Sequence, residues 1–122
     1  MPIGVVSKTR YSGSVTPIEI GAETTIIEVG PEVDDYIVEG YIDLRELASG
    51  DELEIREYIA VDGTNYSLFI KHGVSGPVDA PVMRFHAKTL LKHMKYKVTV
   101  VQTAGTPRTI YYGFVKEVLG SI

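Results

Sequence analysis

Two runs of alternating apolar and polar residues flank an Asp62-Gly63 pair, and no other feature constrains the fold as strongly. The first run covers residues 52–61 and the second covers residues 64–71. Alternation places successive side chains on opposite faces of a strand, and an Asp-Gly pair between two such runs is a strong signal of a β-hairpin. The apolar face of the first strand is expected to hold Leu53, Ile55, Ile59 and Val61, and its polar face Glu52, Glu54, Arg56 and Tyr58. The sequence therefore predicts a hairpin over these two runs.

Two residues interrupt the alternation and carry predictions of their own. Glu57 falls on the apolar face of the first run, which predicts either a β-bulge or a partner cation at that point. Gly40 lies in the middle of the alternating run 36–44, where a glycine indicates a bulge or a close approach of backbone.

Further strand-like segments follow one another along the chain at short spacing. They are residues 24–29, 36–44, 82–87, 95–102 and 108–118. None is followed by a periodic helix long enough for a βαβ unit, which argues against a parallel sheet. We therefore predict an all-β fold, an antiparallel β-sandwich of seven or eight strands with at most one or two short helical turns. Immunoglobulin-like and jelly-roll connectivities both stay open.

The connections between these strands differ in character. Residues 44–51 are expected to make a single turn that tucks Leu44 and Leu47 inward, and residues 73–81 to form a loop rich in Gly and Pro. Residues 89–94 fit either a helical turn or a crossing strand.

The N-terminal part of the chain differs from the rest. Residues 11–17 are small and polar without periodicity. We therefore divide the chain into an N-terminal arm over residues 1–22 and a β-sandwich domain over residues 23–122. The arm is either a frayed terminus or a segment that becomes ordered against a neighbouring subunit.

Composition excludes several classes of function. A chain of 122 residues with a net charge of −4 fits one domain and lacks the basic surface that nucleic acids or anionic membranes require. The sequence has no cysteine, so disulfides, thiolate nucleophiles and cysteine-based zinc sites are ruled out. Neither a signal peptide nor a membrane-spanning segment is expected from the apolar runs.

Residues with catalytic or metal-binding chemistry do not fall into a working pattern. His72, His86 and His93 lack metal-ligand spacing, and no serine lies in a nucleophile elbow. We predict no enzyme activity, no catalytic, cofactor-binding or metal-binding residues, and no cofactor. A calcium loop built from the carboxylates of residues 32–35 is the one alternative kept open.

Four tyrosines are candidate interface anchors: Tyr11, Tyr58, Tyr111 and Tyr112. A tyrosine on an outer strand face offers contact area at a small loss of entropy, or a platform for stacking a sugar. The plain alternative is that tyrosine favours strands.

Three segments resemble small β-sandwich proteins encoded among the structural genes of phages and archaeal viruses. They are residues 48–58, residues 61–66 and residues 96–105. The resemblance implies a virion structural protein, of the capsid decoration or minor head type, that is assembled in the host cytoplasm and has no active site.

Three functions follow from these observations. The leading one is a structural subunit bound in many copies to a capsid or other lattice protein. Its expected partners are other copies of itself, with a trimer preferred, and the major capsid protein. The second is a module that binds a glycan or another protein. The third is a pilus or filament subunit in which residues 1–22 complete the sheet of a neighbour.

Overall fold

The structure, a computed structural model, describes residues 2–122, which fold into eight strands without a helix. The strands are β1 (Ile3–Val15), β2 (Glu23–Val29), β3 (Tyr36–Asp43), β4 (Glu52–Ala60), β5 (Ser67–Ser75), β6 (Val82–Leu90), β7 (Lys95–Ala104) and β8 (Ile110–Ser121). The predicted all-β class is confirmed, and of the predicted seven or eight strands the described residues form eight.

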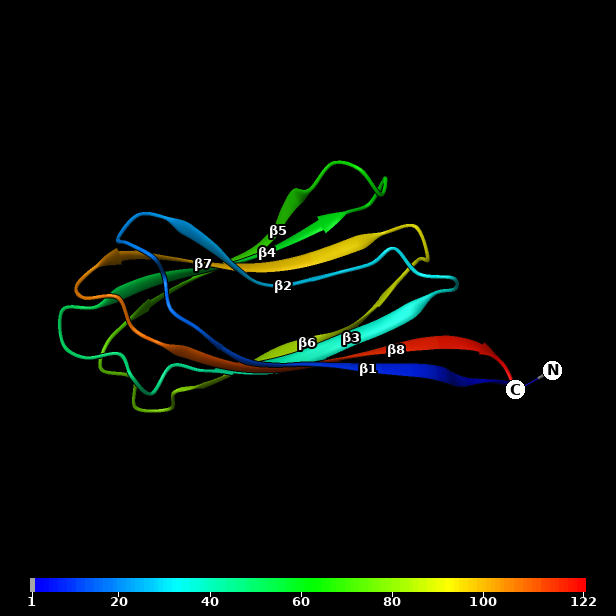
Figure 1. The fold of residues 1–122 in the computed structure, drawn as a ribbon, viewed down its shortest axis with the longest axis horizontal. Helices are drawn as coiled ribbons and strands as arrows, with labels where there is room; N and C mark the ends of the chain where they lie inside the picture. The colour runs from blue at the N-terminus through cyan, green and yellow to red at the C-terminus, as the bar shows by residue number, and fades with distance from the viewer. Residues whose placement is uncertain (1) are drawn as a thin grey trace.

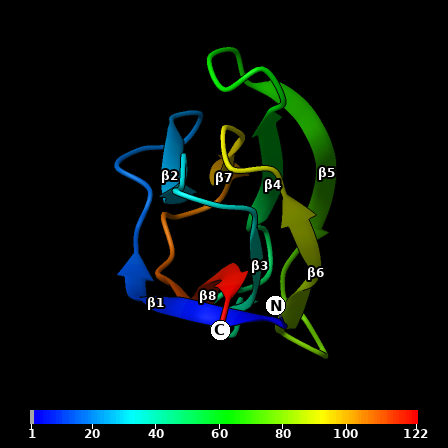
Figure 2. The ribbon, with the colours of Figure 1, turned by 90° about the vertical axis from the view of Figure 1, so that its right-hand side faces the viewer.

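The eight strands form two stacked antiparallel sheets (Figures 1 and 2). Their strand orders are β1-β8-β3-β6 and β2-β7-β4-β5. Four of the pairs are nested along the chain: β4 with β5, β3 with β6, β2 with β7 and β1 with β8. A chain paired in this way is one long hairpin rolled into two sheets, which is a jelly roll. The immunoglobulin-like alternative is wrong, because that fold divides its strands between the sheets in a different order.

The hydrophobic core lies between the sheets and is made of their inward-facing side chains. Its buried members include Val38, Ile42, Leu53, Ile55, Phe85, Val98, Val100, Ile110, Phe114 and Val118. Alternation along each strand places these β-branched and aromatic side chains on one face, and their removal from water is the main force that holds the two sheets together.

The Asp62-Gly63 hairpin is confirmed. Asp62 Oδ1 accepts hydrogen bonds from the backbone N–H groups of Thr64, at 2.8 Å, and Asn65, at 2.7 Å. Gly63 has a φ of 82°, a conformation that glycine adopts without strain. The turn is therefore closed by its own residues.

The bounds of the two hairpin strands differ from the prediction. The turn extends beyond residue 64, so β5 begins at Ser67 and runs to Ser75, into the predicted loop 73–81. Val61, expected on the buried face, lies beyond the end of β4 and is exposed.

Both predicted irregularities are present. The β4–β5 register shifts between Glu57 and Tyr58, and the β3–β6 register shifts between Val38 and Gly40. A Cβ on Gly40 would lie 2.5 Å from the Gly113 carbonyl oxygen, so the backbones approach closely there as well.

Buried Glu57 also has the partner cation that its position predicted, Lys88, and a histidine lies nearby. Lys88 Nζ lies 3.7 Å from Glu57 Oε1, and His72 Nε2 lies 3.6 Å from Glu57 Oε2. The Tyr96 hydroxyl donates a 2.6 Å hydrogen bond to the same carboxylate. Glu57, Lys88 and His72 line a hollow of about 220 Å³ between β5 and β6, so the interior is polar at this open edge of the sandwich.

Two connections between strands are short turns. Leu44 and Leu47 are buried, and the Leu47 N–H donates to the Leu44 carbonyl oxygen at 3.2 Å, as the predicted single turn requires. β6 runs as far as Leu90, beyond the predicted end at residue 87, and a turn closed by the Met94 N–H and the Leu91 carbonyl oxygen follows it.

The segment over residues 1–22 contains a strand that the sequence pattern did not reveal. β1 pairs with β8 from Ile3 to Val15, with one bulge between Val5 and Ser7. Apart from Tyr11 and Val15, its inward positions hold small or polar residues, so the apolar alternation that identified the other strands is interrupted. The division into an arm and a domain stays a prediction, because it concerns how β1 behaves when a neighbouring copy is present.

Candidate functional site

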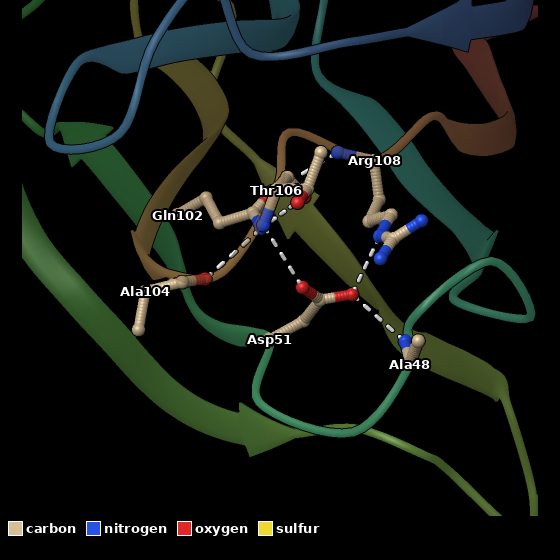
Figure 3. Close-up of polar contacts among 6 residues, drawn as sticks. All are labelled: Ala48, Asp51, Gln102, Ala104, Thr106 and Arg108. Carbon is tan, nitrogen blue, oxygen red and sulfur yellow. Dashed lines mark hydrogen bonds and ion pairs between the residues drawn. The ribbon is translucent and has the colours of Figure 1, made fainter.

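A buried carboxylate joins the turn before β4 to the turn between β7 and β8 (Figure 3). Asp51 Oδ2 accepts hydrogen bonds from the Ala48 N–H, at 2.8 Å, and from Arg108 Nε, at 2.6 Å. Asp51 Oδ1 accepts one from the Thr106 N–H at 3.1 Å. The Ala48 N–H, together with Thr106 and Arg108, holds the pKa of Asp51 below its usual value.

Gln102 completes this cluster and is fully buried. Its Nε2 donates to the carbonyl oxygens of Ala104 and Thr106, at 3.0 and 2.6 Å, and its Oε1 accepts from the Arg108 N–H at 3.1 Å. The Asp51 carboxylate and the Gln102 amide drawn in Figure 3 both bind neighbours within the chain. The cluster therefore links the two loops structurally.

The outer face of the β2-β7-β4-β5 sheet is covered by a polar network centred on Glu23. Its carboxylate accepts hydrogen bonds from the Tyr58 hydroxyl and Thr99 Oγ1, both at 2.6 Å, and pairs with Arg56 Nη1 at 3.1 Å. Lys97 Nζ lies 5.1 Å from the centre of the Tyr58 ring. Tyr58 is one of the predicted interface anchors, and both its hydroxyl and one face of its ring make contacts within the chain.

The other predicted anchors lie in the β1-β8-β3-β6 sheet. Tyr11 and Tyr112 point inward and pack partly buried against the core. Tyr111 points outward, where the Arg45 guanidinium lies 4.2 Å from its ring centre. The four tyrosines do not form one cluster, and their role as anchors stays a prediction.

The outer face of this second sheet is hollowed, which sequence reasoning missed. One hollow of about 340 Å³ is lined by residues of β1, β3 and β8, and a second of about 210 Å³ adjoins it. Tyr41, with 53% of its surface exposed, and Gly113 line both. A glycine inside a strand was the available signal, because it leaves space where every other residue places a side chain.

β1 forms one free edge of the sandwich. It pairs only with β8, and none of its described side chains is fully buried. The exposed apolar residues Val5 and Val6 lie in this edge strand. An edge strand presents unpaired backbone groups that can template pairing with another chain. The edge strand β5 of the other sheet likewise has no fully buried side chain, so both edges are open to pairing with another chain.

The carboxylates considered as a calcium loop are used separately. Glu32 pairs with Lys116, Asp34 Oδ1 accepts the Asp35 N–H, and Asp35 Oδ1 accepts the Lys92 N–H. Over residues 2–122, no three His, Asp or Glu side chains gather in a way that could hold a metal ion. In the same range no helix is long and apolar enough to cross a membrane.

No family model matches this sequence, and no curated protein matches it either. Among solved structures, the chain is similar to a subunit of Bacillus endospore appendages, described as disulfide-linked pili. The TM-score is 0.53 at 13% identity, over 95% of this chain and 88% of that one. It also overlaps VP2 of infectious bursal disease virus in a subviral particle, with a TM-score of 0.49 at 12% identity over 93% of this chain. The chain spans about a third of that capsid protein, 33% of its length. At 13% identity the similarity to the pilus subunit shows a shared fold alone.

Proposed function

We propose that this chain is a non-enzymatic structural subunit that works in many copies, as a decoration or other surface subunit of a virion. Its partners are further copies of itself and a repetitive lattice such as a major capsid protein. The resemblance of residues 48–58, 61–66 and 96–105 to virion proteins motivates the choice of assembly. The observation that carries the proposal is that β1 is a long edge strand without a fully buried side chain.

Edge pairing through β1 needs no rearrangement of the core. The strand is 13 residues long, lies at an edge and has no fully buried side chain. A second copy can therefore add a strand to its free side, or exchange its own β1 for this one. In an exchange the β1–β8 contacts are the same as those within one chain, so little free energy is lost.

The geometry of this contact decides between two kinds of assembly. A head-to-tail contact forms a ring when the rotation between neighbouring subunits returns to the first subunit after a whole number of copies. Otherwise it continues as a filament. A ring of three suits decoration of a lattice, whereas an open chain is the strand-exchanging filament proposed as the alternative. A filament of this protein would be joined without disulfide bonds, because the sequence has no cysteine.

The first test measures the mass of the purified full chain by light scattering over a range of concentrations, with electron microscopy of the same samples. We expect closed oligomers or filaments. The double variant Val5→Lys and Val6→Lys should be monomeric, because charges on an edge strand oppose pairing. The matched control is the double variant Ile18→Lys and Val33→Lys at residues that are 88% and 85% exposed outside β1. Its assembly should be unchanged. A parent protein that stays monomeric at every concentration and binds no capsid would refute the proposal.

The second test separates strand exchange from simple edge addition. Lys8 and Glu117 face each other in the β1–β8 register, where the Cα atoms of paired residues lie about 4.5–5.5 Å apart, close enough for a disulfide. After oxidation of the assembled double variant Lys8→Cys and Glu117→Cys, strand exchange predicts a covalent ladder in a denaturing gel. Simple edge addition predicts only monomers, each with a disulfide inside its own chain. The single variant Lys8→Cys controls for random cross-linking.

A further inference from the structure

The larger hollow on the outer face of the β1-β8-β3-β6 sheet has a notch at its centre. The strand registers place Ser12, Gly113 and Tyr41 side by side across three strands. A Cβ built on Gly113 meets no atom within 4 Å, so the space above this glycine is open. The half-exposed Tyr41 side chain stands on one side of the notch and Ser12 on the other.

The adjoining row of residues supplies charge. Arg10, Val115 and Glu39 lie side by side in the same registers, and all three line the hollow. Lys8 lines it as well and has Glu117 as its neighbour on β8.

Arg10 is the free cation of this row. Within residues 2–122, neither Arg10 nor Lys8 lies within ion-pair distance of a carboxylate. Two cations and one carboxylate therefore border the hollow, on a chain whose net charge is −4.

We propose that this hollow binds a saccharide that carries a carboxylate. A sugar ring can pack its apolar face against Tyr41 above Gly113, as aromatic side chains with an apolar body allow. A guanidinium such as that of Arg10 binds a carboxylate through two parallel hydrogen bonds. Ser12 and Glu39 can hydrogen-bond hydroxyl groups of the ring. The volume of about 340 Å³ suits one or two sugar units better than a protein surface, which needs a much larger contact.

The site does not depend on how the chain assembles. β1 supplies Arg10 and Ser12 whether it comes from the same chain or from an exchanged neighbour, because the β1–β8 register is the same in both. Loss of assembly in the Val5 and Val6 variant therefore tests the proposed function and leaves sugar binding as a separate measurement.

The test is a titration of the isotope-labelled full chain, followed by the amide chemical shifts, with a galacturonic acid trisaccharide and with the neutral galactose trisaccharide. The acidic sugar should shift the amides of Arg10, Tyr41 and Gly113, and added salt should weaken its binding. The neutral sugar should bind at least about tenfold more weakly, as expected when one charged pair of about 1.4 kcal/mol is missing.

Two glycine variants make the test specific for the notch. Gly113→Val fills the open space and should weaken binding of the acidic sugar by at least about tenfold, a loss of about 1.4 kcal/mol. Gly73→Val is the matched control, because Gly73 also lies in a strand, has no atom within 4 Å of its added Cβ and belongs to the other sheet. It should bind as the parent does. Thermal unfolding of both variants confirms that they are folded.

Three results would overturn the proposal. The first is that the acidic trisaccharide shifts no amide up to about 10 mM, a concentration that saturates a site with a Kd of about 1 mM. The second is that folded Gly113→Val binds the acidic sugar as the parent does, and the third is that the parent binds the acidic and neutral sugars equally. Arg10→Gln should bring the two sugars to similar affinity, and an unchanged preference for the acidic sugar in this variant would also contradict the proposed role of the guanidinium.

Discussion

The Arg108 Nε atom lies 2.6 Å from Oδ2 of buried Asp51, and this ion pair connects two turns that are 57 residues apart in the sequence (Figure 3). The pair closes the end of the sandwich where the chain enters β4 and leaves β7. Because the same carboxylate also accepts two backbone N–H groups, it has a donor for each of its oxygens. Buried carboxylates are tolerated under such conditions.

Asp51→Asn should therefore lower the midpoint of thermal unfolding. The amide presents N–H groups to a site that contains only donors, and it loses the charge that Arg108 needs. The control is Asp43→Asn at the exposed pair formed by Asp43 and Arg45, whose loss should matter much less. Equal midpoints for Asp51→Asn and the parent would show that the buried pair does not stabilise the fold.

Stability should fall in acid because Asp62 and Asp51 are among the carboxylates whose pKa values are lowered in the folded state. The N–H of Asn65, with other donors of the turn, lowers the pKa of Asp62 to about 2, and the Ala48 N–H lowers that of Asp51. In both cases the folded pKa lies below the unfolded one, near 3.9. Their stabilising effect is complete above the unfolded pKa and is lost as the pH falls through the folded value. Urea unfolding at pH 7, 4 and 2.5 measures this, and a midpoint that does not change between pH 4 and 2.5 would contradict it. The change should be smaller in Asp62→Ala.

Gly40→Ala should destabilise the domain by about 1–3 kcal/mol, the usual range for overpacking. The added Cβ would lie 2.5 Å from the Gly113 carbonyl oxygen and would overlap the Phe114 ring. Gly73→Ala is the control, because its Cβ meets no atom within 4 Å. Chemical denaturation of both variants tests the contrast, and an equal effect would argue against the close approach of β3 and β8.

Tyr96→Phe should reduce the free energy of unfolding by about 1.5–3 kcal/mol, the range for a hydrogen bond to a charged group. The Tyr96 hydroxyl donates at 2.6 Å to buried Glu57, which retains only more distant contacts with Lys88 and His72. Tyr66→Phe removes a comparable bond to exposed Glu28 and should cost much less. Similar losses in the two variants would mean that burial of Glu57 adds nothing to this bond.

Local pattern was enough to identify most strands and several details within them. The hairpin at Asp62-Gly63, the bulge at Gly40 and the partner cation of Glu57 all follow from a residue type that does not fit the alternation around it. β1 escaped detection, because its inward positions hold Ser, Thr and Gly next to two larger side chains. A strand held by backbone pairing leaves little trace in the apolar pattern.

The candidate sites were much harder to predict. The alternation showed that Tyr111 and Tyr112 point to opposite faces, and only the structure decided that Tyr111 is the outward one. Tyr58 was correctly expected on an outer face, yet its hydroxyl bonds Glu23, 35 residues away. Contacts between residues so far apart depend on which strands become neighbours, and no local signal carries that information.

By itself, the sequence determined that the chain is a succession of short strands and tight turns, because side-chain alternation and turn chemistry act over a few residues. The tertiary structure alone decided that these strands nest as a jelly roll, that β1 lies at an edge, and that Arg10, Tyr41 and Gly113 border one hollow. The physical reason is that strand pairing between distant segments is selected by the burial of the whole core, to which every strand contributes at once.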